Sequence, residues 1–222
     1  EPERLDETLL DRIMVRHSDK LSILPAAANL GAPAPMDADA YEQLVNGIRG
    51  ISPLAILDMP HIWTDWSSKL LTSADEIVIT AAPDLANLRN AKNLIDFLKA
   101  ARPNDPEPLL VLNKTGVPKT AEIPVKEFAA AVGIQPAVVL GYEPVAYTEA
   151  SNDGKMLCDV KAAAAAFDGM MYLAHRLKTG QFPMAAQGKK GKKGKKGKAP
   201  KAAKAGKSGG SSSLIGKLLK RK

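Results

Sequence analysis

Short, continuous apolar runs recur along the first 180 residues and alternate with amphipathic stretches of helical period. Four expected strands contain such runs: PLAILDM at 53–59, EIVITAA at 76–82, PLLVLNKTG at 108–116 and PAVVLGYEP at 136–144. Such runs are typical of strands that are covered on both faces, as in a parallel sheet. The segments between them, such as PDLANLRNAKNLIDFLKAA at 83–101, place apolar residues on one side of a helix. This alternation predicts an α/β fold with a doubly wound, mostly parallel sheet.

Further elements are expected before, between and after these strands. We expect helices over 3–17 (ERLDETLLDRIMVRH), over 37–50, from an aspartate cap to Gly50, over 125–132, ended by Gly133, and over 160–177. LSILPA at 21–26 reads as another strand. Together these elements predict one domain over residues 1–178.

The charge of the chain is divided unevenly. Of the 31 basic residues, 14 lie in 188–222, which has no acidic residue, so residues 1–187 hold 17 basic against 24 acidic residues. The repeats of Gly-Lys-Lys have no large apolar residue and predict a disordered Lys/Gly-rich linker over 179–213. A short basic amphipathic helix is expected over 214–222, with Leu214, Ile215, Leu218 and Leu219 on one face.

Composition bears on the cellular compartment of the chain and on membrane insertion. Its single cysteine, Cys158, allows no intrachain disulfide, which fits a reducing, cytoplasmic location. No apolar run approaches the ~18 residues of a membrane-spanning helix, and the acidic start resembles no signal peptide. The first residue is not Met, so we expect a processed chain or a fragment.

Polar residues end several of the expected strands, where open α/β sheets bind ligands. Asp58 ends the first run, and two interpretations are open: it holds a Mg²⁺ ion, or it caps the turn before Pro60. Asn113 opens NKTG at the end of the third expected strand; its amide can bond a base edge, although an Asn-Gly turn explains the same letters. The backbone at Tyr142, Glu143 and Pro144 ends the fourth expected strand.

Four segments, in this order and spacing, carry a family resemblance. PLAILDMPHIW, SADEIVITAAPDLANLRNAKNLIDFL, LLVLNKTG and GYEPVAYTEASNDGKML resemble the second half of the MinD/ParA ATPases, within the P-loop NTPase-like (SIMIBI) superfamily. They are most similar to the CpaE/TadZ branch of pilus-assembly proteins, and the resemblance covers roughly residues 1–178. It implies that Asp58 acts near Mg²⁺ and the attacking water, that Asn113 contacts adenine, and that Tyr142, Glu143 and Pro144 close the base pocket.

The chain departs from the family pattern at two places. His61 stands where the family's switch loop often has Gly, and a Trp-containing loop follows it, as in the CpaE branch. No GxxxxGK[ST] motif occurs, and the Lys-rich repeat lacks the strand and helix that make a phosphate loop. The resemblance therefore implies that the phosphate loop and the first strand lie upstream of Glu1, and that ATP and Mg²⁺ are bound only by a full-length form.

The resemblance implies a role in positioning a secretion machine. We expect an ATP-dependent homodimer that localises a type IV (Flp/Tad) pilus system, interacts with its pilus and secretion proteins, and is cytoplasmic, polar and peripheral to the inner membrane. Two alternatives stay open: a catalytically silent, membrane-tethered scaffold, and a ParA-like DNA-partition ATPase. The basic tail is expected either to bind an anionic membrane surface or to bind nucleic acid without sequence specificity.

Overall fold

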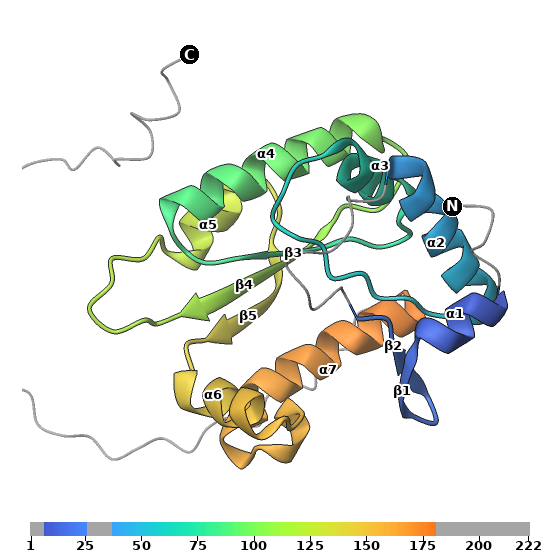
Figure 1. Cartoon of the computed structure of the whole chain (residues 1–222). Helices are drawn as coiled ribbons and strands as arrows, with labels where there is room; N and C mark the ends of the chain where they lie inside the picture. Colours follow the sequence, from blue (N-terminus) through green and yellow to red (C-terminus); the bar gives the residue numbers. More distant parts are fainter. Residues whose placement is uncertain (1–6, 26–36, 181–222) are drawn as a thin grey trace, which may run out of the picture. The chain divides into compact units, whose positions relative to one another are not determined.

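The computed structural model describes residues 7–25 and 37–180 (Figure 1). Its main sheet has three parallel strands in the order β3 (Val78–Ala81), β4 (Leu109–Thr115) and β5 (Pro136–Gly141). Helices α4 (Leu85–Ala101) and α5 (Val125–Val132) make the crossovers between consecutive strands. The predicted α/β fold with a parallel sheet is confirmed, and all three carboxyl ends lie at one edge of the sheet.

One face of the sheet is covered by α4 and α5. Their apolar stripes meet β3 and β4 in a core in which Ile95, Leu110 and Phe128 are completely buried. Asp84 accepts a hydrogen bond from the Asn87 N–H at 2.8 Å and caps the start of α4. Gly133 ends α5 in the left-handed conformation, with φ of 82°, as its sequence position predicts.

The opposite face of β4 and β5 is covered by α7 (Ala164–Thr179). Tyr172 and Leu173 pack on Val111, Val138 and Leu140. Arg176 adds a 2.9 Å ion pair to Glu76, just before β3. The 3₁₀ turns Leu157–Asp159 and Lys161–Ala163 precede α7, so the regular helix begins later than the expected residue 160. Helices thus lie on both faces of the sheet, as a doubly wound fold requires.

The N-terminal part differs from the sequence prediction. Helix α1 (Glu7–Ile13) ends before the expected residue 17, and β1 (Val15–Ser18) follows it. The predicted strand exists as β2 (Leu21–Ile23), but it pairs antiparallel with β1 in an exposed hairpin outside the main sheet. Helix α2 (Ala38–Ile51) begins at the expected cap, where Asp37 accepts from the Ala40 N–H at 2.8 Å.

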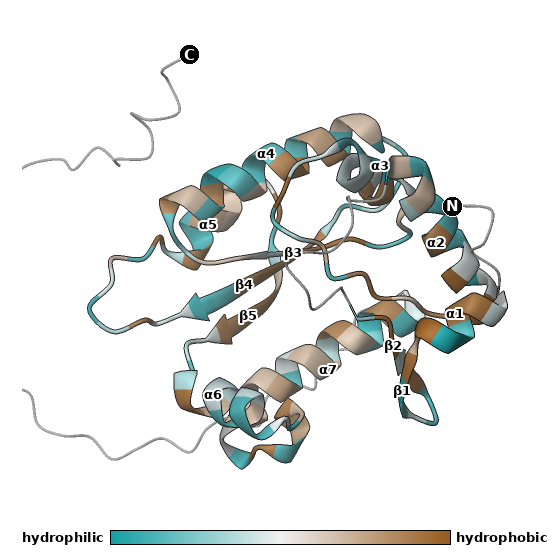
Figure 2. Ribbon diagram, in the orientation of Figure 1, coloured by the Kyte–Doolittle hydropathy of each residue, from teal (hydrophilic) through white to brown (hydrophobic). Residues whose placement is uncertain are grey.

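The prediction of a strand over 53–59 is wrong. This segment is extended but belongs to no sheet, and it leads to α3 (Asp65–Ser73). Leu54 and Ile56 are 61% and 81% exposed. Figure 2 shows this apolar segment running separately from β3. A strand forms only where a neighbour accepts its hydrogen bonds, and the described residues supply none here. The tail elements expected over 179–213 and 214–222 lie, beyond Gly180, outside the described residues.

Candidate functional site

The carboxyl ends of β4 and β5 bring two of the predicted site segments together. The Tyr142 N–H donates to the Thr115 carbonyl at 2.8 Å, and the Thr115 hydroxyl donates to the Leu140 carbonyl at 3.0 Å. Asn113 lies at the same end of β4, and its Oδ1 accepts from the Lys114 N–H at 2.8 Å. That bond leaves the Asn113 amide nitrogen as a hydrogen-bond donor for a ligand.

The loop after β4 is fastened by a carboxylate. Glu122 accepts from the Gly116 N–H at 2.9 Å and from the Val117 N–H at 2.6 Å, one amide on each oxygen. Lys114 and Gly116 both have positive φ, 57° and 82°, so the chain turns sharply there. The NKTG segment is therefore a fixed turn in which the Lys114 and Gly116 amides are already hydrogen-bonded. Sequence reasoning missed Glu122, because nothing in its spacing from Gly116 signals this contact.

A second missed pair lies where α6 (Pro144–Asp153) begins. The Glu143 Oε2 and the Tyr147 hydroxyl are buried, and neither has a hydrogen-bond partner in the described structure. Burial raises the pKa of Tyr147 above its usual value, and the Glu143 carboxylate raises it further. Tyr142 beside them is exposed. The start of α6 therefore offers one aromatic ring at the surface and two buried polar atoms without partners.

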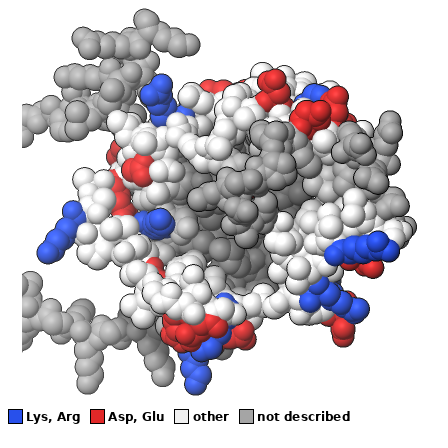
Figure 3. Space-filling view, viewed as in Figure 1, with Lys and Arg blue, Asp and Glu red and all other residues white. Residues whose placement is uncertain are grey.

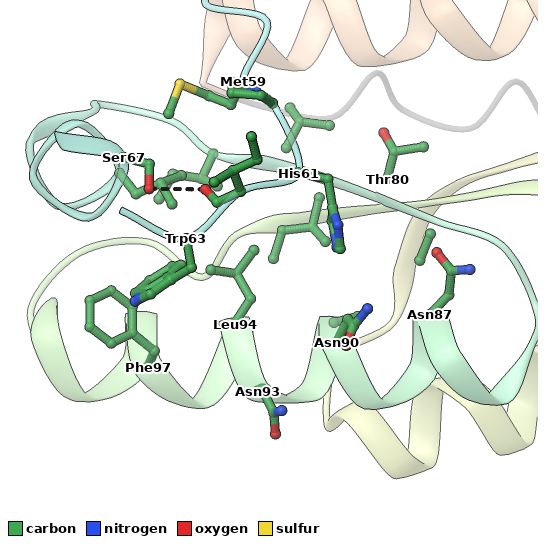
Figure 4. Close-up of a pocket in the computed structure, with 18 of the residues that line it drawn as sticks. Met59, His61, Trp63, Ser67, Thr80, Asn87, Asn90, Asn93, Leu94 and Phe97 are labelled. Carbon is green, nitrogen blue, oxygen red and sulfur yellow. Dashed lines mark hydrogen bonds between the residues drawn. The ribbon is translucent and has the colours of Figure 1, made fainter. Parts of the chain in front are cut away.

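Asp58 lies in a separate groove of about 750 Å³, formed by the segment 57–63, β3 and α4 (Figure 4). His61 points from this segment toward α4. Polar side chains on the other walls are Thr80, Asn87, Asn90 and Asn93. Asp58 itself is exposed, in a segment without regular structure. It does not end a strand, and the described structure shows no hydrogen bond between its side chain and the following turn, so its role toward Mg²⁺ stays a prediction.

The tryptophans after Asp58 make ring contacts with helix residues. Trp63 makes an edge contact with Phe97 of α4, with ring centroids 4.8 Å apart. Trp66 stacks on Tyr41 of α2 at 4.3 Å. Thr64 and Ser67 form a capping box that starts α3. These contacts fix the far end of the groove.

The structure therefore divides the predicted site into two places. Asn113, Tyr142, Glu143 and Pro144 share the ends of β4 and β5. Asp58 lines the groove beside β3, and none of those four residues lines it. Their roles toward Mg²⁺ and ATP stay predictions. Among residues 7–25 and 37–180, no group of three or more His, Cys, Asp or Glu side chains is placed to hold a metal ion.

Charged side chains on the body are mixed rather than gathered. On the face in Figure 3, basic side chains lie next to acidic ones in small groups. Several are paired, such as Lys69 with Asp39 at 2.8 Å and Lys155 with Asp153 at 2.7 Å. In the part of the chain that the structure describes, no helix is long and apolar enough to cross a membrane.

The fold is similar to that of the MinD/ParA-type, P-loop NTPase-like α/β proteins. The structure is similar to that of a ParA family ATPase from Chlorobium tepidum TLS, with a TM-score of 0.64 and 20% identity over 74% of this chain. It is also similar to the MinD cell division protein of Aquifex aeolicus, with a TM-score of 0.52 and 20% identity over 68% of this chain. The matches span 69% and 65% of those two chains.

Sequence comparison adds no closer assignment. No protein-family model and no curated protein sequence matches the chain. At 20% identity the structural likeness shows the fold, and the resemblance to the MinD/ParA superfamily rests on it together with the quoted motifs.

Proposed function

We propose that this chain is the C-terminal part of a MinD/ParA-like ATPase of the CpaE/TadZ type, which localises a type IV (Flp/Tad) pilus secretion system. The fold, shared with a ParA family ATPase and with MinD, supports an ATP-binding, dimerising protein in its full-length form. The order of the four motif segments supports the pilus-assembly branch. In this proposal the protein works with pilus and secretion proteins at the cytoplasmic face of the inner membrane, at the cell pole.

One observation carries the nucleotide-binding part of the proposal. Asn113 and the Tyr142–Pro144 backbone lie at neighbouring carboxyl ends of parallel strands, where open α/β sheets bind ligands. The Asn113 amide offers a donor to a base edge, and the exposed ring of Tyr142 lies at the end of the next strand. Asp58 lies in the groove beside β3, apart from these two strand ends.

The first test is the intact mass of the protein from its own cells, followed by variants of that full-length protein. A mass well above 23.6 kDa supports an upstream phosphate-binding part. In that protein, Asp58→Ala should sharply lower Mg²⁺-dependent ATP turnover, and Asn113→Ala should weaken ATP binding. Asp65→Ala is the matched control, because Asp65 is an exposed aspartate in the first turn of α3 and does not line the groove. Equal turnover in Asp58→Ala and Asp65→Ala would remove Asp58 from the mechanism.

The basic tail is proposed to hold the protein at an anionic membrane surface. Each basic residue near such a surface contributes about 1 kcal/mol, and the apolar face of 214–222 would add insertion energy. Flotation with vesicles that contain phosphatidylglycerol tests this, with phosphatidylcholine vesicles as the control. Replacing Leu218 and Leu219 by Asp should abolish flotation. Unchanged flotation would show that charge alone suffices, and DNA retardation without flotation would favour the DNA-partition alternative.

A silent scaffold is the second candidate, and two observations favour it. The 222 residues contain no GxxxxGK[ST] motif. The described body also exposes apolar side chains that a partner protein would cover, at Leu54 and Ile56 and on the β1–β2 hairpin at Val15 and Ile23. An intact mass of 23.6 kDa, together with pilus assembly that survives Asp58→Ala, would make the scaffold the better interpretation.

A further inference from the structure

Glu122 binds the turn after Asn113 through both of its carboxylate oxygens. Its Oε2 accepts from the Gly116 N–H at 2.9 Å, and its Oε1 accepts from the Val117 N–H at 2.6 Å. Hydrogen bonds to a carboxylate are stronger than those between neutral groups. One side chain therefore fastens two consecutive amides of the turn.

Glu122 is itself held by the body of the domain. The next residue, Ile123, donates its N–H to the Pro83 carbonyl at 2.8 Å, between β3 and α4. The Ile123 side chain is partly buried against the core that α4 and α5 form with the sheet. Glu122 therefore connects the turn after β4 to the end of β3, and not merely to another part of the same loop.

The turn needs this support because its backbone is strained. Lys114 has a φ of 57° and Gly116 a φ of 82°, and both values lie in the left-handed region. Glycine adopts this conformation freely, but a residue with a side chain, such as Lys114, adopts it at a cost in free energy. Such a conformation persists only where the surrounding contacts enforce it. Without Glu122, we expect the turn to relax.

The turn decides what the Asn113 side chain offers to a ligand. Its Oδ1 accepts from the Lys114 N–H at 2.8 Å, so the amide oxygen is already hydrogen-bonded within the strained turn. The side chain then offers the N–H donors of its amide nitrogen. Adenine presents N7 as an acceptor and its N6 amino group as a donor. An Asn113 held in this way therefore matches N7 and not the amino group.

We propose that Glu122 is a positioning residue for nucleotide binding, which holds Asn113 so that its amide nitrogen donates to N7 of a purine base. This proposal rests on the proposed function, in which the base lies at the ends of β4 and β5. The site then selects bases that carry N7, and it does not distinguish the amino group of adenine from the carbonyl group of hypoxanthine. Glu122 does not touch the nucleotide and acts through the turn.

Binding of nucleotide analogues to the full-length protein tests this proposal. The probes are ATP, 7-deaza-ATP, in which a C–H group replaces N7, and inosine triphosphate, which keeps N7 and lacks the amino group. In calorimetric titrations, wild type should bind 7-deaza-ATP about tenfold more weakly than ATP, because one hydrogen bond is lost and its donor is left without a partner. Inosine triphosphate should bind within about threefold of ATP, because the N7 contact is retained.

Variants of Glu122 test the positioning role. Glu122→Ala should weaken ATP binding about tenfold and leave 7-deaza-ATP binding unchanged, so that the two ligands bind equally. Glu122→Gln keeps one acceptor oxygen for one of the two amides, and it should give an intermediate ratio. Glu127→Ala is the matched control, because Glu127 is an exposed glutamate in the first turn of α5, and it should keep the wild-type ratio. A general loss of stability would weaken both ligands alike, so the ratio reports on Asn113.

Amide hydrogen exchange, read by NMR without nucleotide, tests the contact independently of binding. In Glu122→Ala, exchange at Gly116 and Val117 should become roughly tenfold faster or more, while Leu110 and Leu112 in β4 keep their wild-type rates. Unchanged exchange at Gly116 and Val117 would show that Glu122 does not hold the turn, and it would overturn the proposal.

The binding results separate failure of this proposal from failure of the proposed function. If 7-deaza-ATP binds as tightly as ATP, or if inosine triphosphate binds far more weakly, Asn113 does not select N7, although the nucleotide site stands. If Glu122→Ala weakens ATP and 7-deaza-ATP by the same factor, the role of Glu122 is structural only. If wild type binds none of the three nucleotides, the proposed function fails and this proposal fails with it.

Discussion

Helix α7 approaches β5 so closely that a methyl group at Gly169 has no room. A Cβ at this position would lie 2.8 Å from Leu140 Cδ2 and 2.9 Å from Val138 Cγ1. Both partners are buried strand residues that already pack against Tyr172 and Leu173. They therefore have little freedom to move aside, and we expect Gly169→Ala to overpack this interface.

The size of the effect follows from two opposing terms. Replacing glycine by alanine inside a helix stabilises it by about 1 kcal/mol, whereas overpacking a core costs about 1–3 kcal/mol. Gly169→Ala should therefore be destabilising by about 1 kcal/mol. Gly50 in α2 is the matched control, because its Cβ would meet nothing within 4 Å. Gly50→Ala should be neutral or stabilising by up to about 1 kcal/mol.

The comparison of the two variants isolates the steric term, because the propensity gain is similar in both. Urea unfolding followed by circular dichroism should separate them by about 1–3 kcal/mol at equal slope. Thermal midpoints should differ by roughly 2–12 °C for a domain of this size. Gly47, whose Cβ would meet a single side chain, Leu10, at 2.8 Å, should give an intermediate value. If Gly169→Ala were as stable as Gly50→Ala, the described packing of α7 on β5 would be refuted.

Three smaller predictions concern single contacts. Asp84→Ala should lower the free energy of unfolding by about 1 kcal/mol through loss of the α4 cap, and Asp84→Asn should restore most of it, as urea unfolding would show. Tyr147→Phe should leave the free energy of unfolding unchanged or raise it, because the buried hydroxyl has no hydrogen-bond partner in the described structure. The difference in absorbance near 295 nm between wild type and variant, followed against pH, should show that Tyr147 ionises above the usual pH range of tyrosine. The hydrogen bond and charge of Lys69 lower the pKa of Asp39, so this pair stabilises the fold above the usual carboxyl pKa and stops doing so as pH falls through the lowered pKa. The free energies of unfolding of wild type and Asp39→Asn should therefore become equal in acid.

The sequence predicts elements best where local pattern and tertiary neighbours agree. Helices α4 and α5 begin and end close to the expected residues, because their caps, Asp84 and Gly133, are local signals. Strands β3, β4 and β5 lie within the apolar runs, because each finds a parallel neighbour. The run at 53–59 has the same composition but lacks a neighbour in the described chain, and composition alone cannot reveal that.

The candidate site could be predicted only in part. Asn113 lies near the end of β4 and Tyr142 follows β5, and a parallel sheet necessarily brings such strand ends together. Asp58 was expected at the same edge, but its place depends on a strand that the described structure does not contain. Glu122 and the Glu143–Tyr147 pair were missed, because side-chain contacts across a loop or at a helix start leave no periodic signal.

The strand order β3–β4–β5 has a consequence for how the chain folds. Each pairing in this sheet joins two strands that are consecutive in the sequence. Val78 pairs with Leu109 and Leu110 with Pro136, so each pairing closes a loop of only about 30 residues. Short loops of this kind favour rapid folding. On a ribosome the unit from β3 to β5 can assemble once Gly141 has emerged, before α7 (Ala164–Thr179) has left the exit tunnel. The earlier residues would then dock onto a finished sheet, and a fragment that starts at β3 is the natural place to look for an autonomous folding nucleus.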